Sequence, residues 1–376
     1  MRSRRTALLA VATAIAVAGT AAPAGAAAPS WTAVRYFGGT QTTLSALSSV
    51  ANGDLWAAGT VTDNGVAYPA LQHFSNGAWH VRQIVPGDYT NQWGVLTAVA
   101  ATSTTAAWVG GYRIVKSTGV RRPLIALYSG RAWTEIPIPI ASQTAGQIDA
   151  AAARGPDDVW FAGTLHPATS SQRSMRLFHW DGTTLDAIAI PALDGTCNSY
   201  TSETRALTLQ ASSVFVALDC PDSLEPAGSV QRFDGQSWSL VLAPGAHSFI
   251  TGLAATASRL WVVGSFVSGG NWQAAAWRDS GSGFEMLLAP DPTATELWGV
   301  AAIGKRAYAV GGYPSTHTPA VVRFTDLSPR AESVTGSREL FAGAITPDGT
   351  AYAAGPALGG YLGNQSPQTA VYRRVS

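Results

Sequence analysis

Three tryptophans, Trp93, Trp272 and Trp298, stand outside the repeated pattern that accounts for most of the other tryptophans. Trp272 is expected in the flexible loop "SGGNWQ", where no packing supports it. An indole face stacks on the C–H face of a sugar ring, while polar side chains beside it bond to hydroxyl groups. The polar residues that complete this candidate set are Asp149, Glu203, Arg205, His247, Glu296, Tyr313, His317 and Glu339. Together these residue types predict a binding surface for a carbohydrate or cell-envelope polymer. A structural interpretation stays open for the tryptophans, in which Trp298 fills a central channel and Trp93 packs between repeats.

Three of these carboxylates also suggest catalysis. Glu203, Glu296 and Glu339 come from different repeats, and carboxylates facing one funnel can perform acid–base chemistry on a glycoside. Surface carboxylates are also commonly solvated or paired with arginine, and Arg205 and Arg338 are available as partners. A secreted binding module is therefore the favoured function. A polysaccharide-active hydrolase or lyase, and a scaffold for other proteins, are the alternatives.

The histidines give no sign of a metal site. His166, His247 and His317 come from three separate repeats and lack the short spacing typical of zinc ligands. We therefore expect neither a metal nor another cofactor.

Residues 1–26 have the composition of a secretory signal peptide. Arg2, Arg4 and Arg5 precede the apolar run "TALLAVATAIAVAG", and Ala24-Gly25-Ala26 matches a cleavage pattern. Export by the general secretory or the twin-arginine route would leave residues 27–376 outside the cell. No later apolar run is long enough to predict a membrane span. Residues 27–376 hold 21 basic and 23 acidic residues, a balance that offers no general attraction to nucleic acid.

Cys197 and Cys220 are the only two cysteines. In an exported protein such a pair predicts a disulfide. Closing a loop of roughly 24 residues would stabilise the fold by about 3 kcal/mol on the chain-entropy model.

The elements that must position all these residues form seven repeats. Patterns such as "GDLWAAGT" and "DDVWFAGT" centre on Trp56, Trp108, Trp160, Phe215, Trp261, Tyr308 and Tyr352. A second pattern, such as "ALYSGRAW", carries Phe74, Tyr128, Trp180, Phe233, Trp277, Phe324 and Tyr372. Successive centres of the first pattern lie 44 to 55 residues apart. A period of this length is typical of propellers and related arrays.

Each repeat is expected to contain four short strands. A small-residue strand comes first, then the aromatic strand with its glycine, then two strands joined by a turn such as "SNG" or "DG". Seven such repeats predict an all-β chain, a seven-bladed β-propeller that occupies residues 27–376 as one domain. Links between blades and loops after second strands emerge on one face of a propeller. The candidate residues map to that face, here called the upper face, and we expect a monomer.

The segment "SWTAVRYFGG", residues 30–39, is expected to close the ring. The last repeat ends at Ser376 after its third strand, while Trp31 matches the fourth-strand residues Trp79, Trp133 and Trp238. We therefore expect residues 30–35 to pair with the strand that contains Tyr372, which would leave no open edge between the first and last blades. The alternative is a strand that caps the outside of the first blade.

The repeats resemble secreted bacterial propellers of the kelch and galactose-oxidase-like kind. The resemblance rests on the double glycines Gly110-Gly111 and Gly311-Gly312 and on patterns such as "YSGRAW", "PDDVWFAG" and "HWDG", which are similar to repeats of uncharacterised actinobacterial proteins. Only two repeats carry the double glycine, and neither a galactose-oxidase copper set nor a sialidase-type Asp-box is matched. The resemblance therefore implies an architecture and leaves the activity open.

Overall fold

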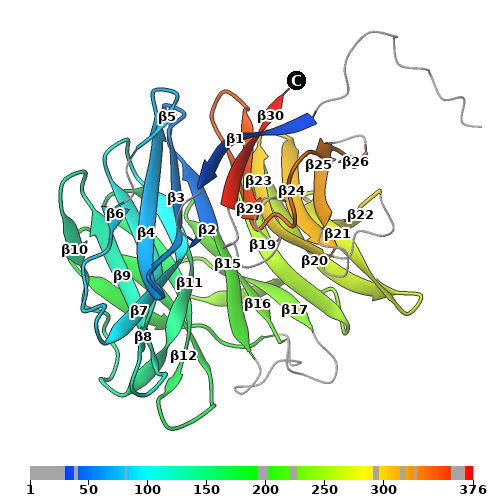
Figure 1. Ribbon diagram of the computed structural model, residues 1–376. Helices are drawn as coiled ribbons and strands as arrows, with labels where there is room; N and C mark the ends of the chain where they lie inside the picture. The colour runs from blue at the N-terminus through cyan, green and yellow to red at the C-terminus, as the bar shows by residue number, and fades with distance from the viewer. Residues whose placement is uncertain are drawn as a thin grey trace, which may run out of the picture.

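The computed structural model shows seven sheets, in which consecutive strands pair antiparallel, arranged as blades around a central channel (Figure 1). It describes residues 30–37, 41–80, 83–193, 202–220, 227–290, 296–313, 318–325, 328–356 and 369–375. Every regular element within these ranges is a strand. The predicted seven-bladed β-propeller is thus confirmed. Residues 1–26, Cys197 and His317 lie outside the described residues.

Six blades follow one another along the chain, each with its first strand innermost. Blade 1 consists of β2 (Gln41–Ser49), β3 (Leu55–Asp63), β4 (Val66–Ser75) and an outer strand split into β5 (Ala78–Trp79) and β6 (Gln83–Ile84). Blade 2 consists of β7 (Gln92–Ala101), β8 (Ala107–Val115), β9 (Arg121–Tyr128) and β10 (Trp133–Glu135). Blade 3 consists of β11 (Thr144–Gly155), β12 (Asp158–Pro167), β13 (Ser174–Trp180) and β14 (Leu185–Ala189).

The next three blades repeat this order. Blade 4 consists of β15 (Glu203–Gln210), β16 (Ser213–Asp219), β17 (Gly228–Phe233) and β18 (Trp238–Leu242). Blade 5 consists of β19 (Ser248–Thr256), β20 (Arg259–Ser268), β21 (Asn271–Asp279) and β22 (Phe284–Leu288). Blade 6 consists of β23 (Glu296–Ile303), β24 (Arg306–Tyr313), β25 (Thr318–Phe324) and β26 (Arg330–Ala331).

Blade 7 joins the two ends of the chain. Its inner strands are β28 (Ala342–Ile345), β29 (Ala351–Pro356) and β30 (Thr369–Val375), and β1 (Ser30–Phe37) pairs antiparallel with β30, with Ala33 opposite Tyr372. Figure 1 shows β1 in blue beside β30 in red. The short β27 (Ser333–Val334) adds to the outer side of β1 in parallel. The predicted closure by the N-terminal strand is confirmed.

The aromatic residue of each second strand packs between neighbouring blades. Trp56 of blade 1 shares a buried cluster with Leu96, Val109 and Tyr128 of blade 2. Trp31 of blade 7 meets Tyr308 of blade 6 edge-on, with ring centres 6.0 Å apart. The repeated aromatics therefore hold the ring together from blade to blade, since burial of such large side chains dominates the energetics of a core.

A one-residue bulge recurs in the first strands. In the described ranges, the register between first and second strand shifts at six equivalent places. The residues at these shifts are Ser45, Thr97, Asp149, Arg205, Thr251 and Trp298. A bulged residue has no cross-strand partner, and the bulge bends the strand and redirects its side chain. All six residues line the central channel.

The repeated glycine of the second strand lets the backbone of the bulged first strand approach closely. Gly163 lies inside β12, where a Cβ atom would come within 2.6 Å of the carbonyl oxygen of Gln147 on the bulged strand. Gly111 faces the carbonyl oxygen of Val95 in the same way. The glycine is required by this close approach of two backbones, because any side chain there would overlap the first strand.

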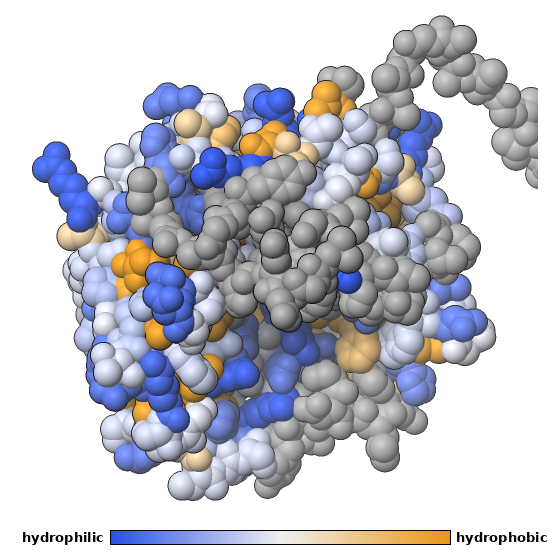
Figure 2. Space-filling model, in the orientation of Figure 1, coloured by the Kyte–Doolittle hydropathy of each residue, from blue (hydrophilic) through white to orange (hydrophobic). Residues whose placement is uncertain are grey.

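The outer surface is polar with scattered apolar side chains. Figure 2 shows orange residues dispersed among blue and white ones on the face in view. Within the residues described, no helix is long and apolar enough to cross a membrane.

Candidate functional site at the channel

The channel contains a pocket of about 160 Å³ to which the first strands of all seven blades contribute. The six bulged residues line it at one level of the fold. Phe341 occupies the corresponding position of blade 7. In blade 6, Gly311 faces the carbonyl of Glu296, which stands two residues before Trp298. In blade 7, Gly355 faces the carbonyl of Glu339 in the same way, and Phe341 stands two residues after Glu339. Each blade therefore offers one residue at this level, and these seven residues are called the channel ring below.

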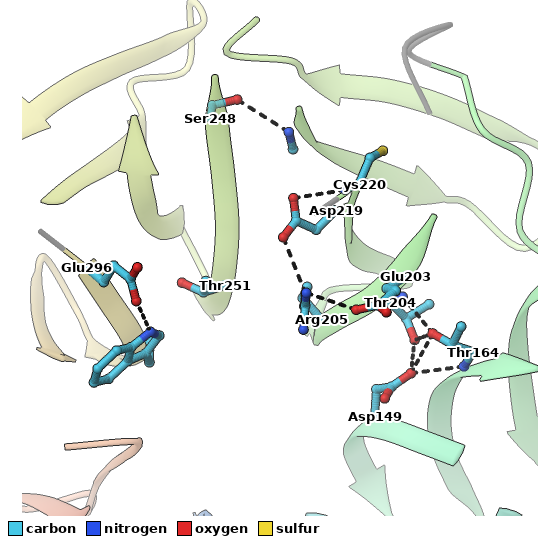
Figure 3. Close-up of polar contacts among 12 residues, drawn as sticks. Asp149, Thr164, Glu203, Thr204, Arg205, Asp219, Cys220, Ser248, Thr251 and Glu296 are labelled. Atoms are coloured by element: carbon cyan, nitrogen blue, oxygen red, sulfur yellow. Dashed lines mark hydrogen bonds and ion pairs between the residues drawn. The ribbon is translucent and has the colours of Figure 1, made fainter. Parts of the chain in front are cut away.

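Asp149 anchors the polar side of the channel ring (Figure 3). Its Oδ1 accepts a hydrogen bond from Gln147 Nε2 at 2.6 Å. Its Oδ2 accepts bonds from the backbone N of Thr164 at 2.9 Å and from Thr164 Oγ1 at 2.8 Å, and a further bond from Thr204 Oγ1. Burial raises the pKa of Asp149 to about 6 in spite of these donors. The carboxyl group ties blade 3 to blade 4 beside the channel.

Arg205 is held next to Asp149 by two acids of blade 4. Its Nη2 lies 2.9 Å from Glu203 Oε2, and its Nε lies 3.4 Å from Asp219 Oδ2 (Figure 3). Arg173 of blade 3 completes the chain of charges, with Nη1 2.7 Å from Glu203 Oε1. The guanidinium of Arg205 is thus fixed in orientation at the channel wall.

Asp219 is the buried end of this chain of charges. Its side chain is almost fully enclosed, and its Oδ1 accepts a bond from the backbone N of Cys220 at 2.9 Å. Burial raises the pKa of Asp219 to about 7, although the attraction of Arg205 opposes this rise. The negative charge of Glu203 adds to the rise.

The aromatic side of the channel ring comes from blades 6 and 7. Trp298 Nε1 donates to Glu296 Oε2 at 2.8 Å, and the indole lies 5.2 Å from the ring centre of Phe341. Phe341 is 38% exposed, which is high for a phenylalanine in a propeller core. Blades 6 and 7 lie across a seven-membered ring from blades 3 and 4. The channel therefore has an aromatic side and a charged side.

Glu339 lies beside this aromatic side. A Cβ atom on Gly312 would come within 2.7 Å of Glu339 Cγ, and Gly312 pairs with Glu296 across the sheet. Glu296 and Glu339 are therefore neighbours at the upper end of blades 6 and 7, and Glu339 is buried.

A second, polar pocket of about 140 Å³ opens beside the charged side of the channel ring. It is lined by Arg121, Gly146, Gln147, Thr164, His166, Arg173 and Glu203. Thr164 and Gln147 bond to Asp149 as well, so the two pockets share a wall.

The structure brings six of the predicted site residues to the channel and its upper rim. Asp149, Arg205 and Trp298 line the channel pocket, and Glu203 and Glu296 bond to two of them. Glu339 lies beside Glu296. Sequence reasoning missed Phe341, Asp219, Arg173 and Thr251. Aligning the repeats on the second-strand glycine would have found Thr251 and Phe341, because both stand at the bulge position. Asp219 and Arg173 carry no repeat signal, since they act through contacts of one blade pair.

The other predicted residues lie elsewhere. Trp93 is 39% exposed on β7, where Lys116 Nζ lies 5.7 Å from the ring centre. His247 is exposed, and its backbone oxygen accepts a bond from Val267 N at 2.9 Å. Tyr313 is half-buried and packs against the core cluster shared by blades 5 and 6.

The expectation that Trp272 stands in an unsupported loop is wrong. Trp272 lies in β21, where it pairs with Val267 of β20. Its ring stacks on Phe249 of the innermost strand, with ring centres 4.8 Å apart and planes inclined by 25°. The strand β21 begins at Asn271, directly after Gly269 and Gly270, which both have positive φ and make the turn.

The described residues contain no group of three or more His, Cys, Asp or Glu side chains that could hold a metal ion. Glu203 and Asp219 are instead engaged by Arg205. The chemistry of the channel ring is therefore that of hydrogen bonds, a fixed guanidinium and aromatic faces.

No protein-family model and no curated protein sequence matches the chain. Among solved structures, YCF48 bound to D1 peptide is similar over 93% of this chain and 99% of its own, with 13% identity and a TM-score of 0.54. The polysaccharide lyase Uly1 is similar over 88% of this chain and 89% of its own, with 11% identity and a TM-score of 0.56.

The GH74 xyloglucanase from Xanthomonas campestris shows the same similarity of fold. It matches 90% of this chain with 14% identity and a TM-score of 0.57, and the match spans 55% of the xyloglucanase. Similarities at this level of identity show a shared fold, and they agree with the blade count: the chain is a seven-bladed β-propeller.

Proposed function

We propose that the protein is a secreted carbohydrate-binding propeller, with its ligand at the upper end of the channel. One observation carries this proposal: Trp298, which packs against the exposed Phe341, lines the channel pocket together with Asp149 and Arg205 of the opposite blades. Secretion rests on the pattern of residues 1–26, and the repeat patterns support a place among secreted propellers of kelch-like kind.

An aromatic side and a charged side suit the two chemical faces of a sugar. The C–H face of a pyranose packs against aromatic rings, while its hydroxyl groups bond to fixed polar groups. Arg205 is already oriented by Glu203 and Asp219, so little ordering entropy is lost when it binds a ligand oxygen. The ring of Phe341 is partly exposed, so it offers apolar surface on which a sugar ring can pack.

The contacts favour binding over catalysis. Asp149 accepts hydrogen bonds from three residues, Glu203 is paired with two arginines, and Glu296 accepts from Trp298. Carboxylates with these hydrogen bonds and ion pairs fix the positions of the side chains around the site. Asp149 nevertheless has a pKa near 6, which is the range of a general acid, so a polysaccharide hydrolase or lyase is the second candidate.

The structural neighbours support a carbohydrate ligand. A polysaccharide lyase and a xyloglucanase share the fold. The peptide-bound YCF48 shares it too, so a protein ligand is the competing outcome.

A glycan array with residues 27–376 tests the proposal. We expect the wild-type protein to bind a defined set of glycans and the Phe341→Ala variant to lose them. Trp93→Ala is the matched control, because Trp93 is equally exposed but neither lines the channel pocket nor has a ring contact with Trp298, whereas Phe341 packs against Trp298. Prolonged incubation of the bound glycans with the protein then separates binding from catalysis: shortened or unsaturated products would establish the enzyme. An array without hits would count against a carbohydrate ligand.

A further inference from the structure

A separate pocket of about 460 Å³ lies between blades 1 and 2. Its walls come from the turns between first and second strands and between third and fourth strands, such as Asn52, Asn76 and Thr105. These turns emerge on the lower face, opposite to the upper face of the propeller. The pocket is larger than the channel pocket and falls within the range of about 300–1,000 Å³ typical of small-molecule sites. None of the candidate binding residues predicted from the sequence lines it.

The inner wall of this lower pocket is a stack of rings. The imidazole of His73 lies flat on the indole of Trp56, with ring centres 4.0 Å apart and planes inclined by 10°. The ring of His80 follows at 5.7 Å from that of His73. Tyr128 of blade 2 adds a further aromatic group to the lining. The pocket therefore has a partly aromatic wall, in which His80 is the exposed ring and His73 is half-buried.

The protonation of His73 is set by its contacts. Burial lowers the pKa of His73, although the neighbouring Asp54 opposes this, and His80 lowers it further. The neutral imidazole is therefore favoured. Its Nε2 donates to Asp54 Oδ2 at 3.2 Å, since a carboxylate only accepts, and its Nδ1 is left as an acceptor.

The charges of the lining residues favour a neutral ligand over an anionic one. Within the described residues, the lining contains no arginine or lysine, and Asp54 is its one carboxylate. Among the described lining residues, an anionic ligand would meet this carboxylate and no arginine or lysine. The amide and hydroxyl groups of Asn52, Asn76 and Thr104 can both donate and accept, which matches the hydroxyl groups of a neutral sugar.

We propose that this lower pocket is a second binding site, which takes a neutral saccharide of one or two rings. The sugar packs on the ring wall of His73 and His80, and its hydroxyl groups bond to the amide and hydroxyl side chains of the surrounding turns. The site does not depend on the channel ring, which lies on different residues. Two sites on opposite faces would let one molecule hold two glycan chains.

Blade 3 supplies an internal control. His179 lies flat on Trp160 at 3.9 Å, and its Nε2 lies 3.0 Å from Asp158 Oδ1. These residues repeat the arrangement of Trp56, His73 and Asp54, but they do not line the lower pocket. A ligand in the lower pocket should therefore affect the His73 and His80 signals and leave that of His179 unchanged.

Imidazole NMR spectra of residues 27–376 test the proposal, with cellobiose, maltose and lactose added in turn. We expect at least one of these neutral disaccharides to shift the His73 and His80 signals saturably, while sodium glucuronate shifts them less. Thr105→Trp, at an exposed position of the lining, should abolish these shifts by filling the pocket. Trp298→Ala should leave them intact.

Three results would overturn the proposal. They are the absence of a saturable shift with all three disaccharides, equal shifts at His179, and shifts that persist in Thr105→Trp. A stronger response to glucuronate than to the neutral sugars would contradict the assigned ligand class. Trp298 lines the channel pocket and not the lower pocket. If Trp298→Ala abolishes binding in the channel but leaves the histidine shifts intact, the two sites are independent, and failure of one proposal does not refute the other.

Discussion

The indole of Trp31 donates a hydrogen bond from Nε1 to Glu332 Oε2, 2.9 Å away, although 301 positions separate the two residues. Glu332 is buried and also accepts bonds from Arg374, from Nε at 2.8 Å and from Nη2 at 3.0 Å. One carboxylate thus joins the first strand, the last strand and the segment that enters blade 7. The ring is therefore closed in two ways: by backbone hydrogen bonds between β1 and β30, and by these side-chain contacts of Glu332.

Removing the indole should open this closure. We expect Trp31→Ala to lower the free energy of unfolding by about 3–5 kcal/mol, because a fully buried indole is lost and Glu332 loses a donor. Val34→Ala, at an exposed position of the same strand, should change it by less than about 0.5 kcal/mol. Chemical denaturation of the two variants measures both values. Equal stability of Trp31→Ala and the wild type would contradict closure by β1.

The bulge and its glycine give a second test of the fold. A Cβ atom at Gly111 would overlap the backbone of Val95, whereas a Cβ atom at Gly155 meets nothing within 4 Å. We expect Gly111→Ala to cost at least about 1–3 kcal/mol of stability and Gly155→Ala to cost far less. Thermal unfolding compares the two. If both substitutions were tolerated alike, the glycine would not be needed for the close approach of the two strands.

The pH dependence of stability should report Asp219. Its pKa rises from 3.8 to about 7 on folding, so between these values the folded protein binds a proton that the unfolded chain releases. The contribution of Asp219 to the free energy of unfolding is therefore present below about pH 4 and is lost as the pH rises toward 7. Asp219→Asn should flatten the fall in stability over this range.

Asp234 provides the control of opposite sign. Hydrogen bonds from the backbone of Ser237 and Gln236 lower the pKa of this exposed carboxyl group, so its contribution is lost on acidification. Asp234→Asn should leave the fall in stability between pH 4 and pH 7 as it is in the wild type. Denaturation curves at several pH values decide between these outcomes, and an unchanged profile of Asp219→Asn would contradict the role given to burial.

The cysteine pair is a prediction from the sequence, since Cys197 lies outside the described residues. Peptide mapping of exported protein without reduction should find the peptides of Cys197 and Cys220 linked. Both thiols free to react with an alkylating agent would rule the disulfide out.

The sequence predicts the fold well because the blade repeats its chemistry seven times. The aromatics of second and third strands, such as Trp56 and Tyr128, recur wherever neighbouring blades must pack. The site is predicted less well because the channel ring varies from blade to blade. Serine, threonine, aspartate, arginine and tryptophan stand at the bulge, and phenylalanine stands at the corresponding position of blade 7, so no residue type marks the position.

Two residues show what the repeat pattern indicates about a position in the fold and what it leaves open. The repeat does not require Trp298, and this residue lines the channel. The repeat does not require Trp272 either, but an extended hairpin and a stack on Phe249 place it against the first strand of its own blade. Absence from a repeat therefore marks a residue as special to one blade, and only its contacts show whether it faces a ligand.

The most direct test of the proposed function is the affinity of channel-ring variants for a glycan identified on the array. Isothermal titration should show that Phe341→Ala and Trp298→Ala each lose about 1–3 kcal/mol of binding free energy, the usual cost of removing a stacking aromatic. Trp93→Ala should bind as the wild type does. If Trp93→Ala lost affinity while Phe341→Ala and Trp298→Ala kept it, the ligand would lie outside the channel and the account of the channel ring would be contradicted.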